Sequence, residues 1–199
     1  MDKPAPVDFP IHDLLARRWS PRAFADRPVE AAILHSLFEA ARWAPSSYNE
    51  QPWRFLVATR DDEAGFARML DCLVPFNQSW AGAAPVLVLG LADSQFSRSG
   101  KPNVHAGHDL GQAAMSLSLE ATARGLVAHQ MAGIEAAKIR ESYALPDEVE
   151  PLTAIALGWP ADPATLAEEM REAEAAPRER RAQAEFVFSG EWGSAAKLG

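Results

Sequence analysis

A run of apolar residues in the middle of the chain is the feature that most constrains its fold. From Pro85 to Leu91 the sequence is almost continuously apolar. A strand with one face in water alternates apolar and polar residues, whereas a strand buried on both faces does not. The run therefore predicts a strand in the interior of the domain.

The remaining apolar pattern predicts a helix-rich chain with a few more short strands. Apolar side chains recur at helical spacing between residues 29 and 43, and Gly125 is suited to end a long helix in a left-handed conformation. Helices are expected at 10–18, 29–43, 61–73, 105–124 and 135–143, and strands at 53–59, 85–91, 126–131 and 152–157. Strand and helix do not alternate strictly, so we expect an α+β or mixed α/β fold with a single domain over residues 1–199.

Three further expectations concern a helix cap and the C-terminal part of the chain. Asp61 is the expected N-cap of the helix at 61–73. The charged, alanine-rich stretch after Pro163 is most simply a solvated helix or loop. The apolar segment Phe186–Phe188 is isolated near the end of the chain. It needs a surface to pack on, either on its own domain or on a second chain.

Composition excludes several classes of protein. The formal net charge is −8, which disfavours non-specific nucleic-acid binding. The longest apolar stretch, residues 83–92, is about half of the roughly 20 residues that span a bilayer, so no membrane span is expected. Cys72 is the only cysteine. It cannot form an intrachain disulfide, which favours a reducing compartment and a cytoplasmic protein.

Common catalytic and metal-binding patterns do not explain the sequence. It contains neither of the two commonest glycine-rich phosphate loops nor a G-x-S-x-G nucleophile motif. Cys72 lies among leucines, where an inert buried thiol is the simpler interpretation. His105, His108 and Asp109 cluster at the start of the longest expected helix, with His129 as a further candidate ligand. Capping and solvated histidines explain them more simply than a metal ion, which needs three or four convergent ligands.

Three segments remain as candidates for ligand binding. Residues 17–24 (RRWSPRAF) gather three arginines and a serine in an acidic chain. Arginine forks match phosphate oxygens, although a basic helix end also complements the helix dipole. Residues 44–53 (APSSYNEQPW) offer amides and hydroxyls that suit a planar heterocycle or an ordinary turn. Residues 156–160 (ALGWP) bring a glycine to a strand end, for close approach to a ligand or for a plain turn.

The combination of these segments is more specific than any one of them. R-x-S-x-R-x-F at residues 18–24, A-R-W-A-P-S-S-x-N-x-Q-P-W-R-F at residues 41–55 and G-x-P at residues 158–160 together resemble the FMN-dependent nitroreductase family. H-D-L-G at residues 108–111 and H-Q-M-A-G at residues 129–133 resemble that family's central helix and the strand that follows it.

The resemblance covers about residues 11–160 and implies a particular fold. It has a central, mostly antiparallel sheet of about four core strands plus a swapped C-terminal strand, flanked by helices that include a long central one. It also implies a homodimer with FMN at the subunit interface, and a tail of about residues 163–199 that extends onto the partner subunit. The small residues Gly111, Ala113 and Ala114 would then let the long helices of two subunits approach closely.

The resemblance implies two groups of cofactor-binding residues. Those at the FMN phosphate are Arg18, Trp19 (through its backbone), Ser20, Arg22, Arg180 and Arg181. Those at the flavin ring are Pro45, Ser46, Ser47 and Asn49, which reach the flavin of the neighbouring subunit, and Leu157 and Gly158, whose backbone lies near the reactive N5 edge. No side chain is expected to be catalytic, because the flavin carries the chemistry.

The implied activity is that of an FMN-dependent oxidoreductase. Hydride from NADH or NADPH would pass through flavin N5 to a small acceptor, such as a nitroaromatic or a quinone, with ping-pong kinetics. Two other interpretations stay open. One is a flavin-binding or flavin-storing protein without useful nicotinamide turnover. The other is a structural or regulatory dimer that has lost the cofactor, against which the retained Arg18, Ser20, Arg22 and Asn49 argue.

The sequence departs from the family pattern in the loop that would reach the flavin. Tyr48 and Glu50 stand where the family often has small or neutral residues. Glu50 would disfavour negatively charged substrates if its carboxylate pointed at the flavin. The polar segment 93–103 is expected to be a loop that leaves little material for a large lid. We therefore expect an open site that accepts many substrates.

Overall fold

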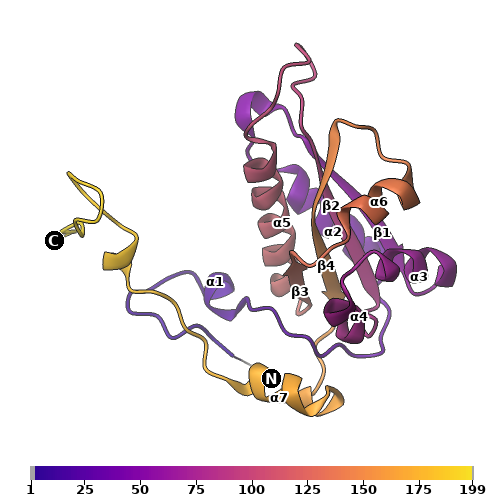
Figure 1. The fold of residues 1–199 in the computed structure, drawn as a ribbon. Coiled ribbons are helices and arrows are strands. Elements are labelled where there is room, and N and C mark those ends of the chain that lie inside the picture. Colours follow the sequence, from indigo (N-terminus) through magenta and orange to yellow (C-terminus); the bar gives the residue numbers. More distant parts are fainter. Residues whose placement is uncertain (1–2, 199) are drawn as a thin grey trace.

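A four-stranded antiparallel sheet forms the centre of the protein in the computed structural model, which describes residues 3–198 (Figure 1). The sheet order is β1-β2-β4-β3. The strands are β1 (Trp53–Thr59), β2 (Val86–Asp93), β3 (Val127–Met131) and β4 (Val149–Gly158). The α+β fold class and all four core strands predicted from the sequence are confirmed, with β4 extending further at its start than expected.

The strand β2 is buried on both faces, as its apolar run predicts. Every residue of β2 before Asp93 is buried. Val86 and Val88 pack into the core on one face of the sheet, and Leu87 and Leu89 pack into the core on the other. This alternation follows the two-residue period of a strand. Because both faces are buried, every position of β2 before Asp93 favours an apolar residue.

Helices cover the two faces of the sheet unequally. The pair α2 (Ala31–Arg42) and α5 (Ala106–Ala123) packs on the face of Val88, where Leu37 and Leu117 are fully buried. The other face is covered by the shorter helices α3 (Glu63–Asp71), α4 (Pro75–Ala81) and α6 (Ala136–Tyr143), which bury Met69 and Ile139 against Leu89. Figure 1 shows α5 running along the whole length of the sheet.

Several local details differ from the sequence prediction. The N-cap of α3 is Asp62, whose carboxylate accepts a hydrogen bond from Gly65 N–H at 3.0 Å, and not Asp61. The helix α4 was not predicted, because its seven residues (PFNQSWA) are too few to show an apolar period. Ala113 and Ala114 are buried in the protein's own core and only Gly111 is exposed. The three therefore do not form one face for a partner helix.

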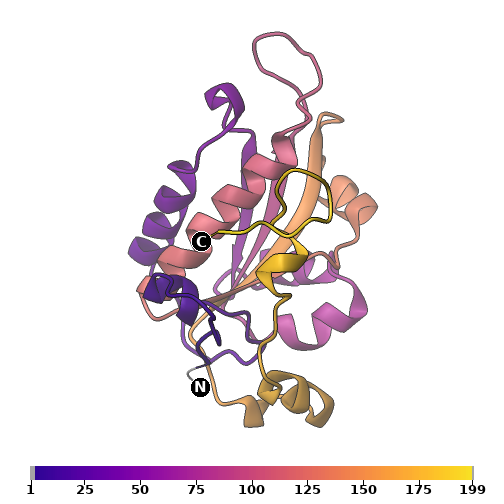
Figure 2. The ribbon, with the colours of Figure 1, turned by 90° about the vertical axis from the view of Figure 1, so that its left-hand side faces the viewer.

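The two ends of the chain lie outside these layers. The helices α1 (Asp13–Arg17) and α7 (Glu168–Ala175) lie on either side of the N-terminal arm, which is residues 3–12. The chain after α7 stands away from the sheet in Figure 1 and passes in front of α5 in Figure 2. No helix within residues 3–198 is long and apolar enough to cross a bilayer.

The expected C-terminal strand at Phe186–Phe188 does not pair with the sheet of its own chain. Phe188 forms an isolated bridge with Ala195, and its ring packs edge-on against that of Trp192 at 5.2 Å. The Trp192 side chain is 93% exposed and that of Phe186 is 59% exposed. Pairing of this segment with a partner subunit, and the extension of residues 163–199 onto that partner, stay predictions.

Gly158 ends β4 where two side chains leave no room for a methyl group. A Cβ atom there would clash with Cδ of Pro85, and it would lie 2.7 Å from Pro85 Cγ and 3.2 Å from Phe24 Cδ1. Glycine is therefore required at this position by packing within the chain, independently of any ligand.

Replacing Gly158 with alanine should lower the free energy of unfolding by about 1–3 kcal/mol, the usual effect of overpacking. Urea titration would measure it. The matched test is the same substitution in a Pro85→Ala background, where the ring atoms are missing and the loss should be much smaller. Equal losses in both backgrounds would contradict this packing argument.

Candidate functional site

A cavity of about 630 Å³ lies between the N-terminal arm and the tail, and arginines concentrate on its wall. Its charged lining residues are Asp8, Arg18, Arg178, Glu179, Arg180 and Arg181. Three of them, Arg18, Arg180 and Arg181, are predicted phosphate ligands. Four guanidinium groups against two carboxylates leave an excess of positive charge, which suits an anion with several oxygens.

Arg18 is placed at the cavity by the end of α1. His12 Nδ1 caps the start of this short helix by accepting from Leu14 N–H at 3.2 Å, and Arg18 is its C-cap residue. Arg18 Nη1 donates to Ser20 Oγ at 3.2 Å, so the first and third positions of the R-x-S-x-R motif are in contact. Trp19 lies between them, with the ammonium group of Lys3 5.1 Å from its ring centroid.

The electrostatic state of Arg18 shows that positive charge is crowded at this site. Burial, and then the nearby charges of Arg178 and Arg180, lower the pKa of the Arg18 guanidinium from its ordinary value. Like charges at close range favour the neutral form. A bound anion would offset this repulsion, so the cavity is electrostatically prepared for one.

Arg178 organises the cavity and was not predicted. Its Nη1 donates to the carbonyl oxygens of Lys3 and Ala16, both at 2.8 Å, and its Nη2 donates to that of Arg18 at 2.9 Å. One guanidinium thereby ties the tail to the N-terminal arm and to the end of α1. The only signal in the sequence is its position next to the pair Arg180-Arg181, and a basic run of that kind is usually solvated.

Arg22 does not line this cavity, although it belongs to the same motif. Its backbone N–H donates to Glu174 Oε1 at 2.7 Å, and its Nη1 lies 3.7 Å from Glu174 Oε2. Its Nε is buried without a hydrogen-bond partner among the residues of the structure. Glu174 is 2% exposed, so the expectation of a solvated stretch after Pro163 is wrong at this residue. Burial of α7 against the motif explains the difference.

His129, which lies on β3, contacts Pro21 in the same arginine motif. Its Nδ1–H donates to the carbonyl oxygen of Pro21 at 3.0 Å, and its ring packs on that of Trp80 with the centroids 4.5 Å apart. Burial, and to a lesser extent the positive charges of Arg22 and Arg18, lower the pKa of His129 to about 4, although its hydrogen bond to Pro21 acts in the opposite direction. The ring is thus a neutral support at pH 7. No group of three or more metal-binding side chains occurs within residues 3–198.

The polar loop at 45–51 is anchored to the start of α5. Ser47 N–H donates to the buried carboxylate of Asp109 in the first turn of α5 at 3.0 Å, and Gln51 N–H donates to Ser46 Oγ at 3.0 Å. Tyr48, Asn49 and Gln51 have φ angles of 54°, 57° and 52°. A backbone that holds three non-glycine residues in the left-handed region stores strain, and such strain concentrates at functional sites.

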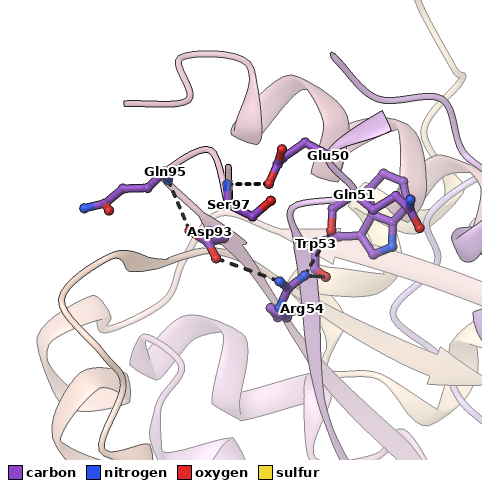
Figure 3. Close-up of polar contacts among 7 residues, drawn as sticks. All are labelled: Glu50, Gln51, Trp53, Arg54, Asp93, Gln95 and Ser97. Atoms are coloured by element: carbon purple, nitrogen blue, oxygen red, sulfur yellow. Dashed lines mark hydrogen bonds and ion pairs between the residues drawn. The ribbon is translucent and has the colours of Figure 1, made fainter. Parts of the chain in front are cut away.

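The Glu50 carboxylate is engaged by the neighbouring loop and is not free to face a ligand. Figure 3 shows Glu50 Oε1 accepting from Ser97 N–H at 2.7 Å. This hydrogen bond, together with nearby Arg98 and Arg54, lowers the pKa of Glu50. Arg54 Nη2 lies 3.8 Å from Asp93 Oδ2, and Arg54 Nη1 donates to the carbonyl oxygen of Gln51 at 3.0 Å. Both contacts are drawn in Figure 3.

The loop at 93–103 is therefore docked on the polar loop. Besides the contact between Glu50 and Ser97, the exposed Tyr48 ring packs edge-on against Phe96 with the centroids 6.0 Å apart. Through these two contacts, the 93–103 loop packs against the 45–51 segment.

Leu157 and Gly158 are buried at the end of β4, where they pair with Ala128 and Val127 of β3. Their side-chain positions face the protein's own interior. Any ligand contact would have to come from the backbone, as the resemblance implies.

The predicted site residues thus fall into two groups within one chain. The structure brings Arg18, Ser20, Arg180 and Arg181 together, whereas Pro45, Ser46, Ser47 and Asn49 lie at the other end of α5. That helix has 18 residues, or about 27 Å at 1.5 Å per residue. Figures 1 and 2 show α1 beside the end of α5 that is far from the 45–51 loop, so the two groups lie apart within one chain.

Comparison with known proteins agrees with this architecture. A model of the Nitroreductase family matches residues 15–73 and 63–159. A Mycolicibacterium smegmatis protein, "Uncharacterized 15.4 kDa protein in ask 5'region", is 36% identical over 149 residues, which cover 71% of this chain and 98% of that protein. A Streptomyces coelicolor protein named "Putative NADH dehydrogenase/NAD(P)H nitroreductase" is 28% identical over 160 residues, covering 71% and 78% of the two chains.

Solved structures show the same fold. A crystal structure described as "the oxidoreductase containing FMN" has a TM-score of 0.90 and 33% sequence identity, and the alignment covers 96% of both chains. A nitroreductase family protein from Clostridium difficile 630 has a TM-score of 0.69 and 25% identity over 89% of this chain and 96% of that one. The chain belongs to the nitroreductase family.

The environment of His129 predicts a pH-dependent contribution to stability. Because its folded pKa of about 4 lies below the ordinary value of about 6.5, the unfolded chain binds the proton first. The contribution is therefore complete above pH 6.5 and is lost as the pH falls toward 4, by at most about 3 kcal/mol.

The substitution His129→Asn should remove this term while keeping an N–H donor for Pro21. Urea unfolding at pH 7 and pH 4.5 should show a smaller difference in unfolding free energy for the variant than for the wild type. His35→Asn, at an exposed position of α2, is the control. If both variants kept the wild-type pH profile, this account of His129 would be wrong.

Proposed function

We propose that this protein is an FMN-dependent oxidoreductase that transfers hydride from NADH or NADPH, through flavin N5, to a small acceptor such as a nitroaromatic or a quinone, with ping-pong kinetics. The observation that carries the proposal is the arginine cavity. Arg18, Arg178, Arg180 and Arg181 face one volume of about 630 Å³, and the FMN phosphate is a dianion with three oxygens.

The residues present fit that phosphate. Arg18 can present its guanidinium fork, and the Ser20 hydroxyl beside it can add a neutral donor. Burial, and then repulsion from Arg178 and Arg180, lower the pKa of Arg18, and a bound dianion would offset that repulsion. Bound FMN would supply the redox chemistry, while the protein's own groups bind and orient it. Few acid–base side chains are then needed.

A homodimer would unite the two groups of residues that one chain keeps apart. The polar loop at 45–51 is anchored at the start of α5, whereas α1, which precedes Arg18, lies beside the other end of that helix (Figure 1). We therefore expect the loop that reaches the flavin to come from a partner subunit. Exposed aromatic rings on the tail, such as Trp192 and Phe186, offer apolar surface for that partner. Light scattering that gave the mass of one chain would contradict the dimer.

The nicotinamide part of the proposal has weaker support than the flavin part. It is supported by the name of the Streptomyces coelicolor relative, whereas FMN is also supported by the solved structure with a TM-score of 0.90. A cytoplasmic location remains a proposal from the single cysteine.

The purified protein should be yellow, with flavin absorbance bands, and anaerobic NADH or NADPH should bleach them within seconds. The measurement is an absorbance spectrum before and after stopped-flow mixing, followed by reoxidation with a quinone or a nitroaromatic. A flavin that binds but is not bleached would favour storage over turnover. A colourless protein that cannot be loaded with FMN would overturn the proposal.

Replacing Arg18 with alanine should weaken FMN binding by about 1.5–3 kcal/mol, because a charge-assisted hydrogen bond is lost. Fluorescence titration of the apoprotein with FMN would measure it. Arg17→Ala is the matched control, since Arg17 is exposed and paired with Asp13 at 2.6 Å. An unchanged dissociation constant in Arg18→Ala would contradict the assignment.

A further inference from the structure

Glu174 is a buried carboxylate in a part of the chain that is otherwise charged and exposed. It is the one buried residue of α7, and its side chain is 1% exposed. Taking a carboxylate out of water is unfavourable unless its oxygens are compensated by donors and positive charge. The contacts of Glu174 therefore need a physical reason.

Both carboxylate oxygens of Glu174 are directed at a single residue of the arginine motif. Oε1 accepts from the backbone N–H of Arg22 at 2.7 Å, and Oε2 lies 3.7 Å from Arg22 Nη1. The carbonyl oxygen of Glu174 accepts from the ammonium group of Lys3. The side chain thus fixes the main chain of Arg22 and also balances its charge.

This contact acts on the turn that carries the phosphate-binding groups. Ser20, two residues before Arg22, accepts from Arg18 Nη1 at 3.2 Å. From the same tail segment, Arg178 donates to the Arg18 carbonyl at 2.9 Å. The turn from Arg18 to Arg22 is therefore held at both ends by residues that follow one another closely in the tail.

The alternative, that Glu174 neutralises the positive charge of the cavity, agrees less well with the geometry. Glu174 does not line the cavity, and Arg18, Arg178 and Arg180 repel one another without relief from it. Its charge is directed at Arg22, which also does not line the cavity.

We propose that Glu174 is a positioning residue of the phosphate site, which holds Arg22 and so fixes the Ser20–Arg22 turn in the conformation that receives a phosphate monoester. This inference rests on the proposed function, because it takes FMN as the ligand. Glu174 need not contact FMN itself. Docking of α7 and retention of the phosphate are then coupled through one carboxylate.

The test compares FMN with riboflavin, which has the same ring system and no phosphate. Dissociation constants of both are measured for the full-length wild type and for Glu174→Ala, Glu174→Asp and Glu174→Gln. Glu174→Ala and Glu174→Asp should weaken FMN at least fivefold and change riboflavin less than twofold, since Arg22 N–H loses its partner. Glu174→Gln should stay within threefold of the wild type for FMN, because its amide oxygen can still accept from Arg22 N–H.

Glu172→Ala is the matched control, since Glu172 is exposed on the same helix. Equal weakening of FMN and riboflavin in the Glu174 variants would indicate a general structural role and overturn the inference, as would unchanged FMN affinity. If Glu174→Ala did not fold, the Asp and Gln variants would decide in the same way. A wild-type protein that binds neither flavin would overturn the proposed function, and this inference with it.

Discussion

Burial of β2 on both faces is the constraint on which the rest of the structure depends. A strand with Val88 on one side and Leu89 on the other is stable only between two apolar layers, because each exposed face would lose about 25 cal/mol for every Å² of apolar surface left in water. One of these layers contains α5, whose length separates the two groups of candidate ligand-binding residues. The geometry of the site is thus a consequence of how the core is covered.

The proposed phosphate site lies where the two ends of the chain meet. Arg18 comes from the end of α1, Arg178 and Glu174 come from the tail, and Lys3 comes from the N-terminal arm. None of these segments belongs to the sheet or to the helices that cover its two faces. Their arrangement rests on charge-assisted hydrogen bonds in place of apolar packing, so we expect ligand binding and tail docking to stabilise each other.

The strong local patterns of the sequence predicted the elements of the fold well. The apolar run of β2, the periodicity of α2 and the left-handed Gly125, with a φ of 79°, each depend on contacts within a few residues. The resemblance of three segments to a known family also indicated which arginines to examine. The helix α4 and the burial of Glu174 could not be predicted. The first has too few residues to show a period, and the second depends on a partner 152 residues away in the sequence.

By itself, the sequence determined most of the secondary structure, the burial of β2 on both faces and the resemblance to a family, because apolar period and motif spacing are local properties of the chain. Only the tertiary structure decided which charges act together. It joined Arg18 to Arg178 and Arg180, assigned Arg22 to Glu174, turned Glu50 toward Ser97 and separated the polar loop from the arginine cavity. Electrostatic interactions depend on distance in space, and folding sets those distances between residues far apart in the chain.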